Sequence, residues 1–458
     1  MINLHFKQTQ RHKDTTFFTG VFCAVLCVLV SLCSIETNAK GNLQKGNRYL
    51  YCHMNDAGPA WTAYALSKDG IHWHDLLDGD SIFSDAVMAP IEKRSRDAFI
   101  CRKHDGSGYL MVFTDMDASN ASRDRLGKVQ TWDNYGICLL TSDDLIHWKS
   151  KGYDFRKGPD IFCDTNDSSP YKDWKTINRV WAPQIVWDED FVWSNGKKGG
   201  YMIYYSMWNR AEEKYDRMYY SHADESFTQL TQPKLLFDWG YATIDADINW
   251  VEADQRWHMM IKKEGGKPGL FTATAPSLTG PWSEPVEDDY VNFEGNKKCE
   301  GVSAFQLADK DTWMIGYIEY SSKPKNYRIC EADRYMRNFK NPKNIEGVAR
   351  PQHGSFMRIT KKEYKRLERW GMKGKKVKAI FCHAAKIFCF CNSREVRLLS
   401  GKKQNKFWFF HSFALILQHG FKLYMDCILC HCISDCTGQA YFLWRRGSVP
   451  CHDELHVR

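Results

Sequence analysis

The hydrophobic positions between residues 46 and 370 fall in short runs, and turn-forming residues separate these runs. Runs that are rich in β-branched and aromatic residues and bounded by glycine, asparagine or aspartate predict β-strands. Five runs of this kind follow one another along the chain: Tyr49–His53, Tyr109–Phe113, Tyr201–Tyr205, Trp257–Ile261 and Trp313–Ile318. Long helical periodicity is absent from this part of the chain, so the pattern predicts an all-β fold.

A seven-residue phrase occurs twice after a strand-like run. Ser67-Lys-Asp-Gly-Ile-His-Trp73 returns as Ser142-Asp-Asp-Leu-Ile-His-Trp148, with five of the seven positions identical. Looser copies, each a strand leading into a turn, lie at residues 217–224, 269–282 and 327–333. Five units about 50 to 80 residues apart have the scale of four-stranded propeller blades. We interpret the phrase as scaffold that marks an outer part of each blade.

An earlier strand precedes four of the five units. These strands are predicted at Arg96–Ile100, Trp181–Val186, Thr243–Ile248 and Cys299–Phe305. The unit at residues 48–73 lacks one, but His353–Ile359 at the far end of the region could complete it. The sequence therefore predicts a five-bladed β-propeller over residues 46–370, its ring closed by pairing of N- and C-terminal strands in one blade.

Charge is distributed unevenly along the chain. Residues 371–458 hold 14 Lys+Arg and 5 Asp+Glu, whereas residues 1–370 hold 49 and 50. The formal charge of +8 thus comes from the tail, and the neutral body gives no support for a nucleic-acid partner. The tail also contains eight cysteines and no repeat. Although Cys427-Ile-Leu-Cys430-His431 formally fits a haem-attachment motif and the nearby Cys432 and Cys436 suggest zinc, we interpret residues 371–458 as disordered or as an unrelated extension.

The first 39 residues have the layout of an export signal. Lys7, Arg11 and Lys13 precede the apolar run 17–33, and Thr37-Asn-Ala39 offers a small-residue cleavage site. An uncleaved membrane anchor is the alternative. We expect a periplasmic or extracellular protein, with no membrane contact beyond this signal. Export permits disulfides, but the six cysteines of the body fit no metal motif, so we interpret them as scattered buried thiols.

Three of the predicted inner strands carry a carboxylate near their start: Asp97, Asp245 and Glu300. The innermost strand of a propeller blade lines the central channel, so radial symmetry would bring these acids towards one axial pocket. Separate acids that converge on one pocket are what glycoside hydrolysis needs. Asp247 lies on the same strand face as Asp245 and is the competing candidate.

At these positions the chain resembles glycoside hydrolase family 43, the five-bladed β-propeller glycosidases. The motifs that carry the resemblance keep the family's order: Arg96-Asp97-Ala, Trp181-Ala-Pro183, Ile244-Asp245-Ala, Glu300-Gly301 and His353-Gly-Ser355. Ala98, Ala246 and Val302 stand where proline is usual, and Gln184 stands where an acid is common. The catalytic carboxylates are intact, while the subfamily and the substrate are left open.

The resemblance implies a role for each acid. Asp97 would be the general base that deprotonates the attacking water, and Glu300 the general acid that protonates the leaving oxygen. Asp245 would raise the pKa of Glu300 and orient it. The outcome would be inversion at the anomeric carbon, which requires base and acid carboxyls roughly 6.5–9.5 Å apart.

Four further residues are candidates for substrate binding: Trp181, Trp208, Arg328 and His353. The tryptophans, with Trp239, would form a sugar-stacking platform, although most tryptophan in a propeller is packing. Arg328 would bind a sugar hydroxyl. The family often places a histidine like His353 near the axis, and a structural calcium ion beside it is an option. No cofactor is required, and no residue set is assigned to a metal.

The activity that we expect is exo hydrolysis of plant-type polysaccharide by an α-L-arabinofuranosidase or a β-xylosidase. An exo-β-galactosidase of the same fold is the enzyme alternative. A non-catalytic carbohydrate-binding propeller is the alternative from another class, but it would not need all three acids. A propeller phosphorylase would need a basic phosphate pocket, and none is identified. We expect an oligo- or polysaccharide partner and a monomer.

Overall fold

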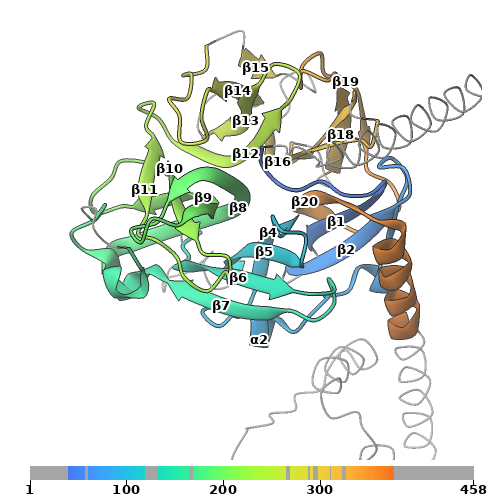
Figure 1. Cartoon of the computed structure of the whole chain (residues 1–458), viewed down its shortest axis with the longest axis horizontal. Coiled ribbons are helices and arrows are strands. Elements are labelled where there is room, and N and C mark those ends of the chain that lie inside the picture. The colour runs from blue at the N-terminus through green and yellow to red at the C-terminus, as the bar shows by residue number, and fades with distance from the viewer. Residues whose placement is uncertain are drawn as a thin grey trace, which may run out of the picture. The chain divides into compact units, whose positions relative to one another are not determined.

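The computed structural model describes residues 40–56, 60–118, 132–164, 169–264, 269–286, 289–291, 298–309, 311–321 and 326–375. Its strands form five four-stranded antiparallel sheets, which Figure 1 shows arranged in a ring around a common centre. The strands nearest that centre are β4, β8, β12, β16 and β20 (Figure 1). The predicted five-bladed β-propeller is confirmed.

Each blade is built from four strands, which follow one another from one edge of its sheet to the other. The first blade contains β20 (Pro351–Ile359), β1 (Arg48–Asn55), β2 (Trp61–Ser67) and β3 (Trp73–Asp75). The second contains β4 (Ser95–Arg102), β5 (Tyr109–Asp115), β6 (Gly136–Ser142) and β7 (Lys149–Asp154). The third contains β8 (Ile177–Val192), β9 (Lys198–Asn209), β10 (Arg217–Ala223) and β11 (Lys234–Phe237).

The last two blades follow the same order. The fourth contains β12 (Thr243–Val251), β13 (Arg256–Lys263), β14 (Leu270–Ala275) and β15 (Tyr290–Val291). The fifth contains β16 (Cys299–Gln306), β17 (Trp313–Glu319), β18 (Asn326–Ala332) and β19 (Lys340–Asn344). Short helices occupy the connections of the first three blades: η1 (Leu77–Gly79), α2 (Asp85–Met88), η2 (Phe155–Lys157), η3 (Pro159–Ile161) and η4 (Trp174–Thr176).

The ring closes in the first blade, as predicted. Strand β20 pairs with β1 in antiparallel register, and Tyr51 is the partner of Phe356. The two rings stack with centroids 4.3 Å apart, and Phe356 also stacks on Phe305 of the fifth blade at 4.5 Å. The closing strand thus supplies apolar surface to the neighbouring blade as well as hydrogen bonds to its own.

The repeated phrase forms a turn after the third strand of two blades. Asp69 Oδ1 accepts hydrogen bonds from the backbone N–H groups of Ile71 and His72, both at 2.9 Å, and Trp73 is buried. The second copy makes the same bonds from Asp144, and Trp148 is buried. An aspartate that binds backbone donors further along the chain is a standard turn former. The phrase is therefore scaffold.

A helix at residues 361–375 follows β20, in a stretch where the sequence pattern predicts no long helix. Thr360 and Glu363 form a capping box at its start: Thr360 N donates to Glu363 Oε2 at 2.6 Å, and Glu363 N donates to Thr360 Oγ1 at 3.2 Å. The same carboxylate accepts 2.8 and 3.0 Å hydrogen bonds from Arg102 on β4. This buried ion pair fixes the start of the helix to the second blade.

The remaining sequence predictions for the body concern cysteines and the two chain ends. Cys52, Cys101 and Cys138 are buried free thiols, as predicted, while Cys163 is a half-buried one. The chain divides into two compact units after Arg369. The export segment at residues 1–39 and nearly all of the 371–458 tail lie outside the described residues. Within the described part of the chain, no helix is both long and apolar enough to cross a membrane.

Candidate active site

Every innermost strand carries an irregularity at the position of its sequence motif. The regular pairing with the neighbouring strand is interrupted at residues 97–98 of β4, 182–183 of β8, 245–246 of β12, 301–302 of β16 and 352–353 of β20. Bulges of this kind redirect side chains and are common beside active sites. All three predicted catalytic acids and His353 therefore lie at or directly beside a bulge in the innermost strand of a blade.

The bulges also explain why the acid motifs differ by one residue. Asp97 and Asp245 have positive φ angles of 54° and 55°, and the matching residue of β16 is Gly301 with φ 61°. Glu300 therefore stands one residue before the left-handed position that the two aspartates occupy. Left-handed backbone costs a non-glycine residue on the order of 1–3 kcal/mol and is retained when the surroundings enforce it.

Asp97 and His353 form an ion pair near the axis of the ring. The imidazole Nδ1 lies 3.4 Å from Asp97 Oδ1, and the side chains of His353 and Asp97 are 8% and 15% exposed. Burial opposes the charge on each group, but His353 outweighs it at Asp97 and lowers the pKa of that carboxyl. The charge of Asp245, followed by the interaction with Asp97, raises the pKa of His353 to about 9. Asp97 is thus held as a carboxylate.

Asp245 connects the fourth blade to the fifth beside Glu300. Its Oδ2 accepts a 3.0 Å hydrogen bond from the backbone N–H of Gly301. Burial and the charge of Asp97 raise the pKa of Asp245, while His353 acts in the opposite direction. Asp245 therefore holds the backbone that presents Glu300.

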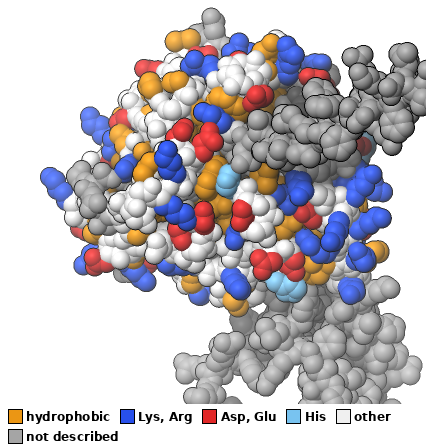
Figure 2. Space-filling view, viewed as in Figure 1, with side chains coloured by type: hydrophobic (Ala, Val, Ile, Leu, Met, Phe, Trp, Pro, Cys, Tyr) orange, Lys and Arg blue, Asp and Glu red, His pale blue; other side chains and the backbone are white. Residues whose placement is uncertain are grey.

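Glu300 has the opposite electrostatic setting to Asp97. Burial, followed by the charge of Asp245, raises the pKa of Glu300 to about 7. A carboxyl in such surroundings keeps a proton near neutral pH and can donate it. Acidic side chains and a histidine come to the surface near the middle of the ring in Figure 2. The arrangement therefore combines an ionised carboxylate with a protonated carboxylic acid in one region.

Asp247, the competing candidate on β12, is more deeply buried. It is 2% exposed, and its Oδ2 accepts hydrogen bonds from Ala304 N at 3.0 Å and from Asn249 Nδ2 at 2.6 Å. Burial raises the pKa of Asp247 to about 7. Gln184, which stands where an acid is common, is also 2% exposed and accepts a 2.7 Å hydrogen bond from Tyr204. These buried side chains tie neighbouring strands and blades together.

The structure brings Trp181 and Trp208 together, but with a guanidinium between them. The Arg179 Cζ lies 4.2 Å from the centre of the Trp181 ring and 4.9 Å from that of Trp208. Arg210 Cζ lies 4.7 Å from the Trp208 ring. Cation–π contacts therefore occupy part of the aromatic surface that was expected to stack on sugar. Any sugar contact must use the remaining ring surface or the guanidinium groups.

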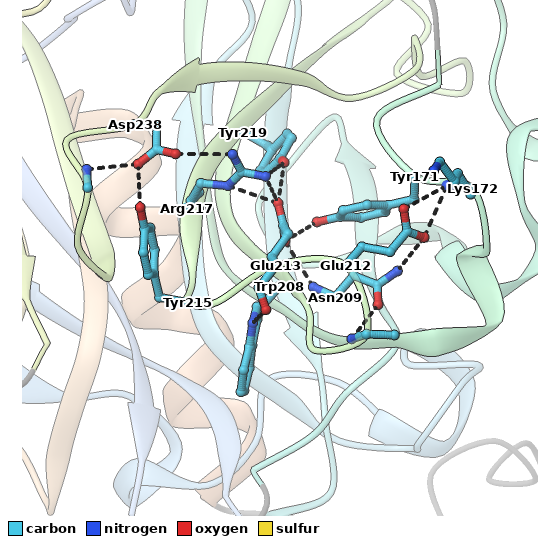
Figure 3. Close-up of polar contacts among 12 residues, drawn as sticks. Tyr171, Lys172, Trp208, Asn209, Glu212, Glu213, Tyr215, Arg217, Tyr219 and Asp238 are labelled. Atoms are coloured by element: carbon cyan, nitrogen blue, oxygen red, sulfur yellow. Dashed lines mark hydrogen bonds and ion pairs between the residues drawn. The ribbon is translucent and has the colours of Figure 1, made fainter.

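A hydrogen-bond network around Glu213 holds Trp208 in place (Figure 3). Trp208 Nε1 donates to the backbone carbonyl of Glu213 at 3.1 Å. The Glu213 carboxylate, 3% exposed, accepts hydrogen bonds from Arg217, Tyr219 and Tyr171. These partners join the β9–β10 connection to the segment before η4. Because the Glu213 carboxylate already has several hydrogen-bond donors, we assign it a structural role: it supports Trp208 and the β9–β10 connection.

Arg328 is not brought to the acids. It lies on β18, the third strand of the fifth blade, and its guanidinium donates to Asn344 Oδ1 at 2.7 Å and to the Pro342 carbonyl at 3.1 Å. Both acceptors are on β19. Two strands separate β19 from β16, the strand that carries Glu300. The hydrogen bonds of Arg328 thus link β18 to β19, and a hydroxyl-binding role for Arg328 remains a prediction.

A structural calcium ion beside His353 is the metal option that the sequence raises. Among the residues that the structure describes, no group of three or more His, Cys, Asp or Glu side chains is placed to hold a metal ion. The Nδ1 atom of His353 already faces Asp97. A calcium ion beside His353 therefore stays a prediction, and no chemical step is assigned to one.

Sequence reasoning missed two residues that are coupled electrostatically to Glu300, namely Lys262 and Tyr320. Lys262 is 4% exposed, and its Nζ donates to the Tyr320 hydroxyl at 3.1 Å. The available signal was a lysine that directly follows the apolar run Trp257–Ile261, at the level of the Ile244-Asp245 motif. The position of Lys262 near Asp245 depends on the pairing of β12 with β13, which the local sequence pattern does not specify.

Comparison with known proteins identifies the family of this chain. A family model described as "Probable glycosyl hydrolase domain", related to glycoside hydrolase family 43, matches residues 47–365. An α-L-arabinofuranosidase from Bifidobacterium longum subsp. longum is 21% identical over 299 residues, which cover 58% of this chain and 25% of that protein. The chain thus spans about a quarter of the length of that relative.

Several solved structures are also similar to this chain. A thermostable family-43 glycoside hydrolase is 14% identical, with 60% of this chain and 81% of that chain covered and a TM-score of 0.39. An endo-1,4-β-xylanase from Bacteroides thetaiotaomicron is 10% identical, with coverages of 70% and 99% and a TM-score of 0.43. The family match alone extends over more than half of the chain. The chain therefore belongs to the glycosyl hydrolase domain family related to glycoside hydrolase family 43.

Proposed function

We propose that the protein is an inverting exo-glycosidase that removes α-L-arabinofuranosyl or β-xylosyl units from plant-type polysaccharide. The observation that carries the proposal is the contrast between two carboxyl groups. His353 keeps Asp97 ionised, whereas burial and Asp245 keep Glu300 protonated near neutral pH. Two carboxyls whose pKa values are driven apart supply the base and the acid of this reaction. The arabinofuranosidase relative supports the choice of sugar.

The reaction needs one proton transfer at each carboxyl. Asp97 takes a proton from water while the water oxygen forms a bond to the anomeric carbon. The glycosidic C–O bond breaks on the opposite face, and Glu300 gives its proton to the leaving oxygen. Asp97 ends protonated and Glu300 ends ionised, so solvent must exchange both protons before the next turnover. Direct attack by water inverts the anomeric centre.

The sugar and the stereochemistry can be tested in one experiment. Purified protein is assayed on aryl α-L-arabinofuranoside, aryl β-xyloside and aryl β-galactoside, and NMR follows the anomer that is released first. Turnover of either pentoside with inversion supports the proposal. Retention would overturn the mechanism, and exclusive turnover of the galactoside would overturn the choice of sugar. Saccharide binding without turnover of any substrate would instead identify a carbohydrate-binding propeller.

A further inference from the structure

Lys262 is a buried lysine in the inner part of the fourth blade. It lies near the end of β13, pairs with Ile244, and so lies at the level of Asp245. Its side chain is not directed to solvent, since the residue is only 4% exposed. Lysine is rarely buried to this extent without a partner for its charge. What the ammonium group faces therefore bears on its role.

The ammonium group of Lys262 is fixed by an aromatic residue of the next blade. Nζ donates to the Tyr320 hydroxyl at 3.1 Å and lies 5.4 Å from the centre of its ring. Tyr320 directly follows β17, the strand whose Ile318 is paired with Glu300. The lysine thus reaches from β13 towards the strand pair that presents Glu300.

The charged groups that act on Glu300 come from several strands. Asp245 on β12 and Glu264 after β13 disfavour its ionised form, while Lys262 on β13 and His353 on β20 favour it. In turn, the charge of Glu300 raises the pKa of Tyr320, after burial the largest effect on that phenol. Lys262, which Tyr320 holds in place, is therefore coupled electrostatically to Glu300 between the fourth and fifth blades.

We propose that Lys262 is a positioning residue for the reaction, whose buried ammonium, held by Tyr320, stabilises the carboxylate that Glu300 becomes after donating its proton. The inference rests on the proposed function, in which Glu300 is the proton donor. In this step the proton leaves Glu300 for the glycosidic oxygen, and Lys262 stabilises the negative charge that remains on Glu300.

The Lys262 ammonium allows Glu300 both to hold its proton before the reaction and to release it during the reaction, which burial alone would not. Burial and Asp245 ensure that Glu300 is protonated, but without a nearby cation the same surroundings would make it reluctant to release the proton. General acids work best when their pKa lies near the working pH. Lys262 limits the effect of the two acidic neighbours and keeps the pKa of Glu300 near 7.

The test replaces Lys262 by methionine and follows kcat/KM against pH on a pentoside with a poor leaving group. Because Glu300 must be protonated, its ionisation defines the alkaline limit of activity. We expect this limit to move to higher pH by about one unit when the cation is removed, and the rate below the limit to fall. Lys262→Arg, which retains the charge, should stay closer to the wild-type profile.

Lys263 provides the matched control. It is adjacent in sequence, but its Nζ lies 3.8 Å from the centre of the Tyr241 ring and it is not among the main groups that act on Glu300. Lys263→Met should therefore leave the alkaline limit unchanged. An unmoved limit in folded Lys262→Met, or an equal shift in Lys263→Met, would overturn the proposal.

Two further measurements test the proposal if Lys262→Met does not fold or if no hydrolysed glycoside is identified. Tyr320→Phe removes only the hydroxyl that fixes Lys262, and it should move the alkaline limit in the same direction by less. The ionisation of Glu300 can also be followed without turnover, by infrared difference spectra of wild type against Glu300→Gln during a pH titration. The Glu300 carboxyl signal should persist to higher pH in Lys262→Met, and its failure to do so contradicts the role of Lys262 even if no glycoside is hydrolysed.

Discussion

The imidazole Nδ1 of His353 lies 3.4 Å from the Oδ1 of Asp97, and this pair joins the closing strand of the ring to the innermost strand of the next blade. The Ser355 hydroxyl of β20 also donates to the Ala98 carbonyl, and its oxygen accepts a hydrogen bond from the Ile100 N–H. Asp97 and its charge partner are therefore held by two strands that hydrogen-bond to one another directly.

Replacing His353 by glutamine should move the acidic limit of activity to higher pH. Burial alone would raise the pKa of Asp97, and His353 is the main group that lowers it below its ordinary value. Because the proposed base must be ionised, activity is lost as the pH falls through the pKa of Asp97. Removing the His353 cation raises that pKa, so the loss occurs at higher pH. The measurement is kcat/KM across the acidic pH range. An acidic limit identical to that of wild type contradicts the assigned pair.

Replacing Asp97 by asparagine or Glu300 by glutamine should lower kcat by about 10²–10⁴-fold, the usual value of a positioned acid or base. The two variants should differ in their response to the leaving group. Loss of the acid matters most for alcohols that leave poorly, whereas loss of the base should slow all substrates alike. Thermal unfolding of each variant checks that the fold is intact. Undiminished hydrolysis of a natural substrate by Glu300→Gln would end its assignment as the acid.

Gly301→Ala should impair both stability and activity. A Cβ at Gly301 would lie 3.1 Å from His353 Cγ, and its φ of 61° disfavours any side chain. Gly240→Ala is the matched control, since Gly240 has φ 81° but a Cβ there would meet nothing within 4 Å. Backbone strain alone should cost each variant about 1–2 kcal/mol in urea unfolding. Only Gly301→Ala should also lower kcat/KM, because its new Cβ would press on His353. Equal kcat/KM values in the two variants would show that this contact does not matter for activity.

Glu363→Gln should lower the free energy of unfolding by about 3–5 kcal/mol, because the Arg102 guanidinium would stay buried without its counter-ion. The side chains of Arg102 and Glu363 are 3% and 11% exposed. Lys197 and Glu225 form an ion pair with side chains 52% and 60% exposed, so Glu225→Gln should cost less than about 1 kcal/mol. Chemical denaturation compares the two, and similar losses would contradict the difference in burial.

The Glu363 carboxylate also predicts how stability depends on pH. Burial would raise the pKa of Glu363, but hydrogen bonds from Arg102 and Tyr109 outweigh it and lower the pKa to about 2. A group with a lowered pKa stabilises the folded state above its ordinary pKa of about 4.3 and loses that contribution as the pH falls towards the lowered value. Wild type should therefore lose more stability than Glu363→Gln over this interval, as measured by urea unfolding at a series of pH values.

The strand order and the three acids could be predicted from sequence because each depends on a short local pattern. The Ile244-Asp245 and Glu300-Gly301 motifs stand at strand starts, and the repeat that ends in Trp73 and Trp148 sets the spacing of blades. The one-residue offset between Asp245 and Glu300 could not be predicted, because it follows from a bulge that only strand pairing defines.

The other differences have separate physical causes. Lys262 and Tyr320 meet across two blades, and no local pattern relates them. Arg328 was predicted to bind a hydroxyl, and two of its hydrogen bonds run to the next strand of the same sheet, a pairing that the sequence pattern does not specify. The helix at residues 361–375 does have a local signal, the Thr360–Glu363 capping box, but its few apolar positions give only weak helical periodicity.

Closure of the ring by β20 has a consequence for the order in which the protein becomes active. A chain still being synthesised makes β1 first and must wait for residues 351–359 before that blade has its inner strand. Those residues also deliver His353, so Asp97 lacks its charge partner until the last strand arrives. Such long-range pairing is slow to form, because chain entropy is lost before contacts compensate for it. The strand that closes the propeller is therefore also the strand that brings His353 to Asp97, and in a partly folded chain the proposed base lacks its charge partner.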